Sequence, residues 1–319
     1  MPLTILSPPR RRFTTQPSPE PAWQALHRIA DSVYNALRDA TMTALGTMRQ
    51  RLQTSARAMR AALSTKSSLA VESTLAQAVA AGQQVLRATL PTMLTETVSR
   101  AAQAITPQTA AMLAEATGQV VVDLGVAFNV TNPQALYAIH TYIGEQITGI
   151  GERTLLTVRS LVHQGFEEGW GVPRLASELA GHIGLTMRQA DAVATLRHGL
   201  VEQGMARAQM QQVLARDIQR KLQQRADAVA RTESINAASL GQQLLWEEAE
   251  RQGFWGEDMR RFWLVTPDDR LCPGCRQIPG LNPEGVRLRD PFLTPYGPMM
   301  HPTAHPLCRC SVTAQRVVV

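Results

Sequence analysis

The residues of this chain with the clearest capacity for chemistry are its four cysteines, all in the C-terminal part. They form two closely spaced pairs, Cys272 with Cys275 and Cys308 with Cys310, and His305 lies just before the second pair. Thiolates and imidazoles are the usual ligands of structural zinc, and a CxxC segment can present two sulfurs from one tight loop. The pattern therefore favours a structural zinc site over free thiols, with disulfides third.

The second cysteine pair leaves the set of four ligands open. In a regular strand Cys308 and Cys310 would lie on one face, two residues apart, so both can bind one ion only if the chain bends. His305 is the alternative to one of them. A site with four protein ligands is closed and has no position for a reacting water, which favours a scaffold over a catalyst. The sequence has no HExxH motif, and we expect no enzyme.

The chain before the cysteines has the composition of long helices, with many alanines and frequent Leu, Arg, Gln and Glu. Apolar residues at helical spacing predict one long helix over residues 23–63 with at most one break. A second helix is predicted to end or kink at Pro91, and another to begin at Pro107 and run to about residue 124. Helices this long need a bundle, an extended arm or another subunit to bury their apolar faces.

The composition changes at residue 254, where Trp, Pro and Gly become frequent and Ala becomes rare. Short strands are predicted at residues 262–265, 286–288 and 311–313. A module of this size has a small core, so a bound zinc ion, worth on the order of 10 kcal/mol, would decide its stability. We expect a mainly α protein in which long helices form an elongated bundle or stalk, with a small β-rich C-terminal module stapled by zinc.

The expected organisation has four parts. Residues 1–21 form a disordered, basic, proline-rich tail, and residues 22–127 form an N-terminal long-helix region. Residues 128–253 form a helical body, and residues 254–319 form the Cys/His module. No signal peptide or membrane span is expected, because the longest apolar run is interrupted by Asp123 and Asn129. A soluble protein of a reducing cytoplasm fits this pattern.

The net charge of +6 is compatible with an anionic partner such as nucleic acid. Residues 172–198 have the spacing of a helix-turn-helix that turns at Gly184. A helical hairpin packed in an α-helical core is favoured over a DNA-reading unit, because the second helix has few side chains suited to base edges. Basic residues that could contact phosphates, although such runs are more often only solvated, are Arg10, Arg11, Arg12, Arg216, Arg220 and Lys221.

An ordered series of short segments carries a family resemblance. It begins with Ala230-Arg231-Thr232-Glu233 and Asn236, continues through Trp263 and residues 268–275, and ends with His305-Pro306-Leu307-Cys308-Arg309-Cys310. The series resembles the minor head, or head-morphogenesis, proteins of tailed bacteriophages and prophages, the phage Mu protein F-like family. The resemblance covers about residues 128–312 and is strongest from Arg231 onward.

The resemblance implies a structural virion protein that acts in capsid assembly near the portal vertex, in several copies per particle. Its partners would be the portal protein, the major capsid protein or both, and packaged double-stranded DNA. It would be found in the virion head, and in the host cytoplasm during assembly. Arg231, Glu233 and Asn236 would hold their helix against the C-terminal module. The alternative is a zinc-containing DNA-binding protein that uses residues 172–198 and the basic helix faces.

Overall fold

The computed structural model describes residues 21–64, 68–117, 133–168, 171–266 and 269–317. Arg10, Arg11 and Arg12, the end predicted at about residue 124 and the boundary between 127 and 128 lie outside these residues. The elements are α1 (Ala22–Thr54), α2 (Ala56–Ser64), α3 (Ser68–Thr117), α5 (Pro133–Glu167), α6 (Val172–His182), α7 (Met187–Glu202), α8 (Arg207–Arg251), β1 (Met259–Leu264), α9 (Pro273–Leu281) and β2 (Ser311–Arg316).

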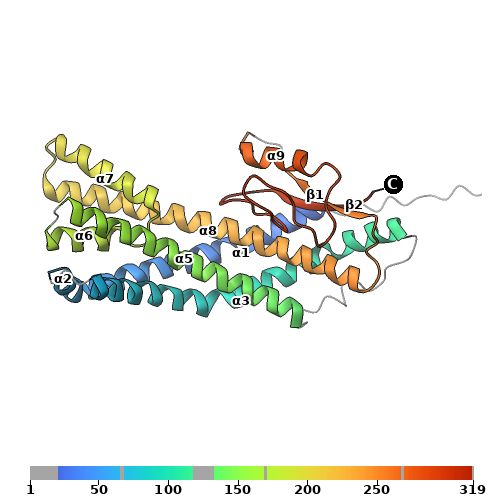
Figure 1. The fold of residues 1–319 in the computed structure, drawn as a ribbon, viewed down its shortest axis with the longest axis horizontal. Coiled ribbons are helices and arrows are strands. Elements are labelled where there is room, and N and C mark those ends of the chain that lie inside the picture. Colours follow the sequence, from blue (N-terminus) through green and yellow to red (C-terminus); the bar gives the residue numbers. More distant parts are fainter. Residues whose placement is uncertain (1–20, 65–67, 118–132, 169–170, 267–268, 318–319) are drawn as a thin grey trace, which may run out of the picture.

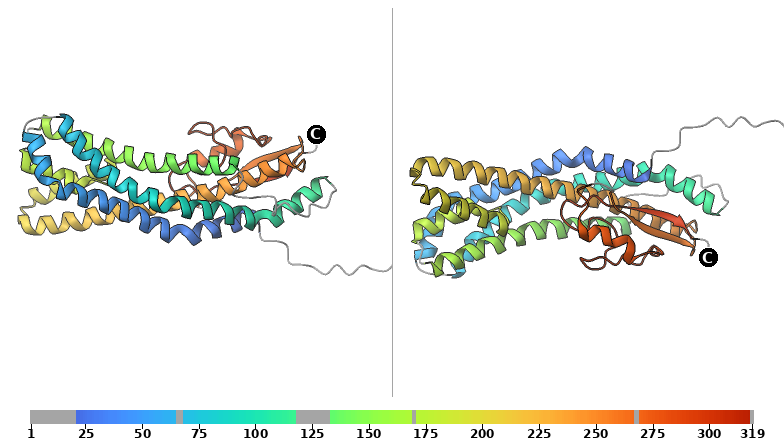
Figure 2. Two further views of the ribbon diagram at one scale, coloured as in Figure 1. Left: turned by 90° about the horizontal axis from the view of Figure 1, so that it is seen from below. Right: turned by 90° about the horizontal axis from the view of Figure 1, so that it is seen from above.

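The long helices form an elongated bundle. Helix α1 packs against α3 and α8, and α5 packs against α3, so these helices lie side by side along the long axis (Figure 1). Helices α2, α6 and α7 gather at one end, whereas β1, β2 and α9 lie on one side of the bundle toward the other end (Figure 2). The expectation of a mainly helical protein with a small strand-containing C-terminal module is confirmed. No helix in the described ranges is long and apolar enough to cross a bilayer.

The helical period seen in the sequence forms the core. Helix α1 ends at Thr54 and α2 begins at Ala56, so the long helix predicted over residues 23–63 has the one break allowed for it. Apolar residues three or four positions apart lie on one face of α1, which is buried in the bundle. Removing this apolar surface from water is the main contribution to the stability of the packed helix. The larger ones are Leu26, Val33, Leu37, Leu45, Met48 and Leu52.

A helix that ends or kinks was predicted at Pro91, and the end is not found; the prediction that another helix begins at Pro107 is wrong. Helix α3 is continuous from Ser68 to Thr117 and contains both prolines. A proline removes one helical hydrogen bond and normally kinks or ends a helix. Here Leu90, Leu94 and Ile105, which flank the two prolines, are at most 4% exposed in the shared core. Burial of the residues next to each proline therefore keeps the helix in one piece.

Helices α3 and α8 pack very closely where they cross at Gly241. A Cβ atom at Gly241 would lie 2.4 Å from the carbonyl oxygen of Val98, which is closer than such atoms approach in proteins. Helices α1 and α3 are similarly close at Gly82, where a Cβ would lie 2.4 Å from Cγ of Met48. These glycines allow two helix backbones to come together.

The hairpin predicted over residues 172–198 is present as α6 and α7. Gly184 takes a positive φ of 89° in the turn, and Thr186 and Gln189 form a capping box at the start of α7. Ile183 and Leu185, on either side of Gly184, are fully buried. The turn itself is therefore packed into the helical core.

The C-terminal module is built on a two-stranded antiparallel sheet. Strand β1 pairs with β2, with Trp263 opposite Val312. The strands predicted at residues 262–265 and 311–313 are confirmed within a few residues. The one predicted at residues 286–288 is only an isolated bridge between Val286 and Arg261. The sheet is small, which is why other interactions must hold the module together.

Arg261 is the central residue of the module and is 0% exposed. Its guanidinium donates to Gln243 Oε1 of α8 at 2.7 Å and to the carbonyl oxygens of Met300 and Asp290 at 2.6 Å each. It also lies 5.0 Å from the centre of the Phe292 ring. Burial lowers the pKa of Arg261 to about 10, which leaves it charged at neutral pH. One cation thus ties the irregular segments of the module to the sheet and to α8.

Candidate metal centre

The first cysteine pair lies at the start of a helix, and not in the tight loop that was expected. Cys272 is the N-cap of α9, Pro273 occupies the first turn, and the backbone N–H of Cys275 donates to Cys272 Sγ at 3.2 Å. Proline suits this position because the first helical N–H groups have no internal partner. A Cβ at Gly274 would lie 2.2 Å from the Tyr296 hydroxyl, so Gly274 is needed for close approach.

The second cysteine pair lies in a bend, which answers the question raised by its CxC spacing. Leu307 has a positive φ of 63°, and the backbone N–H of Cys308 donates to the carbonyl of His305 at 3.1 Å. Strand β2 begins only at Ser311, so Cys308 and Cys310 precede the regular strand. Both are buried, and each has its sulfur within 4.8 Å of Cys275 Sγ.

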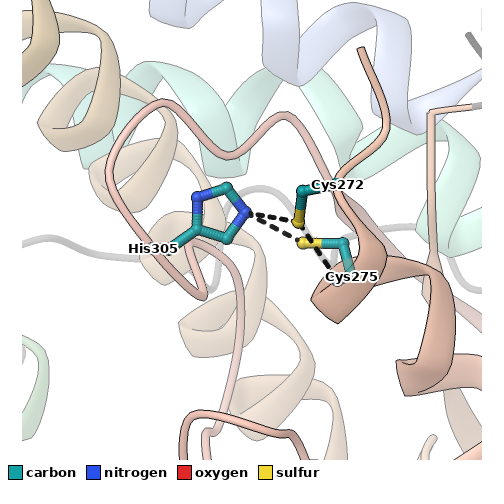
Figure 3. A group of neighbouring side chains, drawn as sticks. All are labelled: Cys272, Cys275 and His305. Atoms are coloured by element: carbon teal, nitrogen blue, oxygen red, sulfur yellow. Dashed lines mark hydrogen bonds between the residues drawn. The ribbon is translucent and has the colours of Figure 1, made fainter. Parts of the chain in front are cut away.

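The five predicted ligands come together in two groups that share Cys275. In one group, Cys272 Sγ and Cys275 Sγ each lie 3.1 Å from His305 Nε2 (Figure 3). The other group contains Cys275, Cys308 and Cys310, and Cys275 Sγ lies 3.8 Å from Cys308 Sγ. Zn–S bonds of about 2.3 Å in a tetrahedron give an S···S edge of about 3.8 Å. The residues therefore fit a metal ion, with Cys275 central to either choice of ligands.

The imidazole of His305 is held in the orientation that a metal ligand needs. Its Nδ1 lies 2.8 Å from the carbonyl oxygen of Pro306. A carbonyl can only accept, so Nδ1 carries the proton and Nε2 presents its lone pair toward Cys272 and Cys275. The Tyr296 ring lies 5.4 Å from the His305 ring, and its hydroxyl lies 3.7 Å from Cys272 Sγ.

Two of the four thiols ionise easily and two do not. Burial opposes ionisation of Cys272, but the Cys275 N–H, Tyr296 and His305 outweigh it and lower its pKa to about 7. A hydrogen bond from Cys310 lowers the pKa of Cys308 to about 5. Burial and the nearby Cys308 thiolate raise the pKa of Cys275 to about 12. Cys308 and burial raise the pKa of Cys310 as well. A bound cation would attract the thiolates, so it would lower the pKa values of Cys275 and Cys310 and release their protons.

The space at the cluster suits an ion and little else. The cavity that the sulfurs border has a volume of about 20 Å³, close to the space for a single water. Around it, the hydroxyl of Thr266 donates to the carbonyl of Arg309, between the two cysteines of the second pair, at 2.8 Å. This arrangement is typical of a closed structural site rather than one that admits a substrate.

The residues of the Arg231 segment lie on α8, and Arg231 and Glu233 bond to other helices of the bundle. Arg231 pairs with Asp31 of α1 at 3.0 Å, and Glu233 accepts a hydrogen bond of 2.5 Å from Tyr142 of α5. Burial raises the pKa of Glu233, although hydrogen bonds from Tyr142 and Asn236 oppose the shift. These bonds join α8 to α1 and α5. Thr232, in the same segment, joins α8 to the module, because its hydroxyl accepts the N–H of Leu307 at 3.0 Å.

The basic residues predicted on α8 are partly engaged within the helix. Arg220 and Lys221 both form ion pairs with the buried carboxylate of Asp217. Arg216 is exposed. Intrahelical pairing of this kind reduces the charge that a phosphate would meet, so Arg216 is the member of this set that remains best suited to such a contact.

Two residues of the site were missed by the sequence reasoning. Tyr296 lies next to Cys272 and His305, and Arg261 bonds to the carbonyls of Asp290 and Met300, in the segment between the two cysteine pairs. The alternation of Met259, Arg261 and Trp263 in β1 was a usable signal, since these alternate residues face the buried side of the strand. No local signal marks Tyr296, which reaches the cluster from a loop.

Compared with known proteins, the chain matches no protein-family model, no curated protein and no solved structure. The resemblance described above therefore depends on the short segments of the sequence themselves. The geometry adds that these segments converge, because Thr232 on α8 contacts the loop that carries His305 and Cys308.

Proposed function

We propose that this chain is a structural minor head protein of a tailed phage or prophage, which acts in head assembly near the portal. The observation that carries the proposal is the convergence of the Arg231 segment, the CPGC segment and the HPLCRC segment at one place on a long helical bundle. In this role the bundle supplies surfaces for the portal or the major capsid protein. The Cys/His module, held by a zinc ion, supplies a rigid contact of fixed shape. The chemistry is binding, and no reaction is assigned.

Zinc is proposed because its ligand preferences match the cluster. Thiolates and an imidazole are soft and borderline ligands, which favour zinc over magnesium or calcium. The ion would be held by Cys275 with three of Cys272, His305, Cys308 and Cys310. When bound, it would supply a cross-link between α9 and the segment before β2. The small cavity at the sulfurs supports a structural ion.

The proposal is tested on assembled particles. Particles purified from the phage or induced prophage that encodes the chain should contain it in few copies relative to the major capsid protein, by quantitative mass spectrometry. Cryo-electron microscopy should place it at or near the portal vertex. Deleting the gene should reduce the yield of filled heads. Particles that lack the chain and assemble normally without it would contradict the proposal.

A zinc-containing DNA-binding protein is the second candidate, and charge at one end of the bundle favours it. Helices α2, α6 and α7 carry five arginines against three acidic residues, namely Arg57, Arg60, Arg174, Arg188 and Arg197 against Glu178, Asp191 and Glu202. Binding through such a surface should weaken steeply with salt and show little sequence preference. A preference of 1,000-fold or so for one sequence would instead favour a specific DNA-binding protein.

A further inference from the structure

The outer edge of strand β2 carries backbone groups that no neighbouring strand uses. Arg261 of β1 exchanges two backbone hydrogen bonds with Val286, at 2.8 and 2.9 Å, so its N–H and C=O point away from β2. In an antiparallel pair, the residue opposite then points its own N–H and C=O outward on the other side. That residue is Ala314, and the alternation along the strand gives the same result for Val312. Within the described ranges, no group forms a hydrogen bond with these N–H and C=O groups.

This unpaired edge is buried and lies against a cavity of about 320 Å³. Val312 and Ala314 are only 3% and 7% exposed, and buried backbone groups normally have a hydrogen-bond partner. The side chains of Thr313 and Ala314 point to opposite faces of the sheet, yet both residues border the cavity. The cavity therefore lies at the edge of the sheet, where a third strand would run. Its other walls come from the start of α1, from α3 and from α8, and include Pro21, Trp23, Met112, Gln242 and Trp246.

A polar side chain of α8 borders the same cavity with an unused donor. Gln242 is 2% exposed, and its amide nitrogen has no acceptor among the residues that the structure describes. Buried amide groups of this kind are normally hydrogen-bonded. An occupant of the cavity must therefore offer a carbonyl oxygen to α8, and both N–H and C=O groups to β2. An extended piece of polypeptide has these groups on its two edges.

The chain itself reaches this cavity at Pro21, where the described residues begin. Pro21 borders the cavity and has the extended backbone angles φ −53° and ψ 136°. The five residues before it are Gln16-Pro17-Ser18-Pro19-Glu20, with proline at every second position. Because the N–H groups of a strand alternate between its two edges, the prolines of such a segment share one edge. The other edge keeps its N–H and C=O groups for pairing with β2, whereas the proline edge offers only carbonyl oxygens, which are the acceptors that the Gln242 amide needs.

The direction of the chain also suits a third strand. His27 of α1 borders a second cavity together with Arg309 and Ser311, where β2 begins. Pro21 borders the first cavity beside residues 312–314, farther along β2. The chain from His27 back to Pro21 therefore follows β2 toward its end, and the residues before Pro21 can continue along it in the antiparallel sense.

We propose that residues 16–20 of this chain add to the open edge of β2 as a third, antiparallel strand. Ser18 and Glu20 exchange backbone hydrogen bonds with β2, and Pro17 and Pro19 face away from it. The occupant is the chain's own segment because it is joined directly to a wall of the cavity, and a short tether gives an effective concentration in the millimolar range. Proline on the new outer edge also prevents a further strand from adding. This proposal does not depend on the assembly function and can fail separately from it.

The test measures the exchange of individual amide hydrogens in the full chain, by NMR or by mass spectrometry with electron-transfer fragmentation. Ser18→Pro removes a donor at a position that faces β2. It should speed the exchange of the Val312 and Ala314 N–H groups about tenfold or more, the factor expected when a hydrogen bond is lost. The N–H of Thr313, which points toward Phe262 of β1, should stay protected in both proteins and shows that the sheet is intact. Equal exchange at Val312 and Ala314 in the unaltered chain and in Ser18→Pro overturns the proposal.

Two further variants and a dilution series identify the segment and its geometry. Ser7→Pro is the matched control, because Ser7 also precedes a proline but lies outside residues 16–20; it should leave the exchange of Val312 and Ala314 unchanged. Pro19→Ala alters only the outer edge of the proposed strand and should also leave this exchange slow. If Pro19→Ala speeds exchange as much as Ser18→Pro, residues 16–20 do not pair as a strand and the proposal fails. Exchange should not depend on protein concentration, whereas protection that is lost on dilution would mean that a second copy supplies the segment, which contradicts the proposal.

Discussion

Replacing Arg261 by methionine should destabilise the C-terminal module more than any other single change on its sheet. The guanidinium makes its shortest hydrogen bonds to Gln243 Oε1 and to the carbonyls of Met300 and Asp290, at 2.6 to 2.7 Å. It makes two longer bonds to the carbonyl of Arg287, at 3.2 and 3.3 Å. Methionine fills much of the same volume but donates to none of these acceptors.

The magnitude follows from the acceptors that would be left buried. A buried polar group that loses its partner costs about 1–3 kcal/mol, and breaking a buried charged network costs about 3–5 kcal/mol. Three short bonds are lost at once, so we expect Arg261→Met to lower the free energy of unfolding of the module by about 4 kcal/mol. That is a large part of the total stability of most domains, which is about 5–15 kcal/mol.

The assay should separate the module from the helical bundle. Hydrogen exchange followed by mass spectrometry reports protection segment by segment, and peptides from residues 259–316 should lose protection while those of α1 and α3 keep theirs. Arg260→Met is the matched control, because Arg260 is the next residue on β1 and bonds only locally, to the carbonyls of Glu257 and Met259. It should change stability by no more than about 0.5 kcal/mol. If Arg261→Met and Arg260→Met give the same hydrogen exchange in residues 259–316, the proposed role of Arg261 is refuted.

Three further predictions concern the metal, the helix crossing and acid. Purified protein should contain about one equivalent of zinc by elemental analysis. The Cys275→Ser variant should lose more zinc than Cys310→Ser, because Cys275 belongs to both ligand groups. Equal zinc contents in the two variants would contradict this prediction. Gly241→Ala should destabilise by about 1–3 kcal/mol through overpacking, whereas Gly46→Ala, with open space around it, should stabilise by about 0.5–1 kcal/mol; thermal unfolding tests the opposite signs. Burial lowers the pKa of His182 to about 4, so below pH 6.5 the unfolded chain takes up a proton before the folded chain does. Stability should therefore fall between pH 6.5 and 4, by on the order of 2–3 kcal/mol, and His182→Gln should remove that part of the pH dependence in urea titrations.

Much of the architecture could be predicted from local patterns. Apolar residues at helical spacing predicted a long first helix with at most one break, because burial of one face is what stabilises such a helix. The glycine at position 184 marked the turn between α6 and α7, since a positive φ strains any residue with a Cβ. The spacing of the cysteines and the histidine predicted one cluster, because few arrangements bring two such pairs together by chance.

The errors and omissions have a common physical origin in contacts that are distant in sequence. Pro91 and Pro107 carry helix-breaking signals, but burial against neighbouring helices outweighs the lost hydrogen bonds. The CPGC segment had the residues of a tight loop, yet it begins α9. The partners of Arg231 and Glu233 lie about 200 and 91 residues away in the chain, on α1 and α5. No local pattern could name them.

The sequence by itself determined the helical character, the place of the hairpin and the identity of the five cluster residues, because each of these depends on residue type and short-range spacing. Only the tertiary structure decided that the chain bends between Leu307 and Ser311 so that both Cys308 and Cys310 reach Cys275. It alone also placed Tyr296 next to the cluster and brought Arg261 to the carbonyls of Asp290 and Met300. Those positions are set by packing and hydrogen bonds between segments far apart in the chain, which act only once the chain has folded.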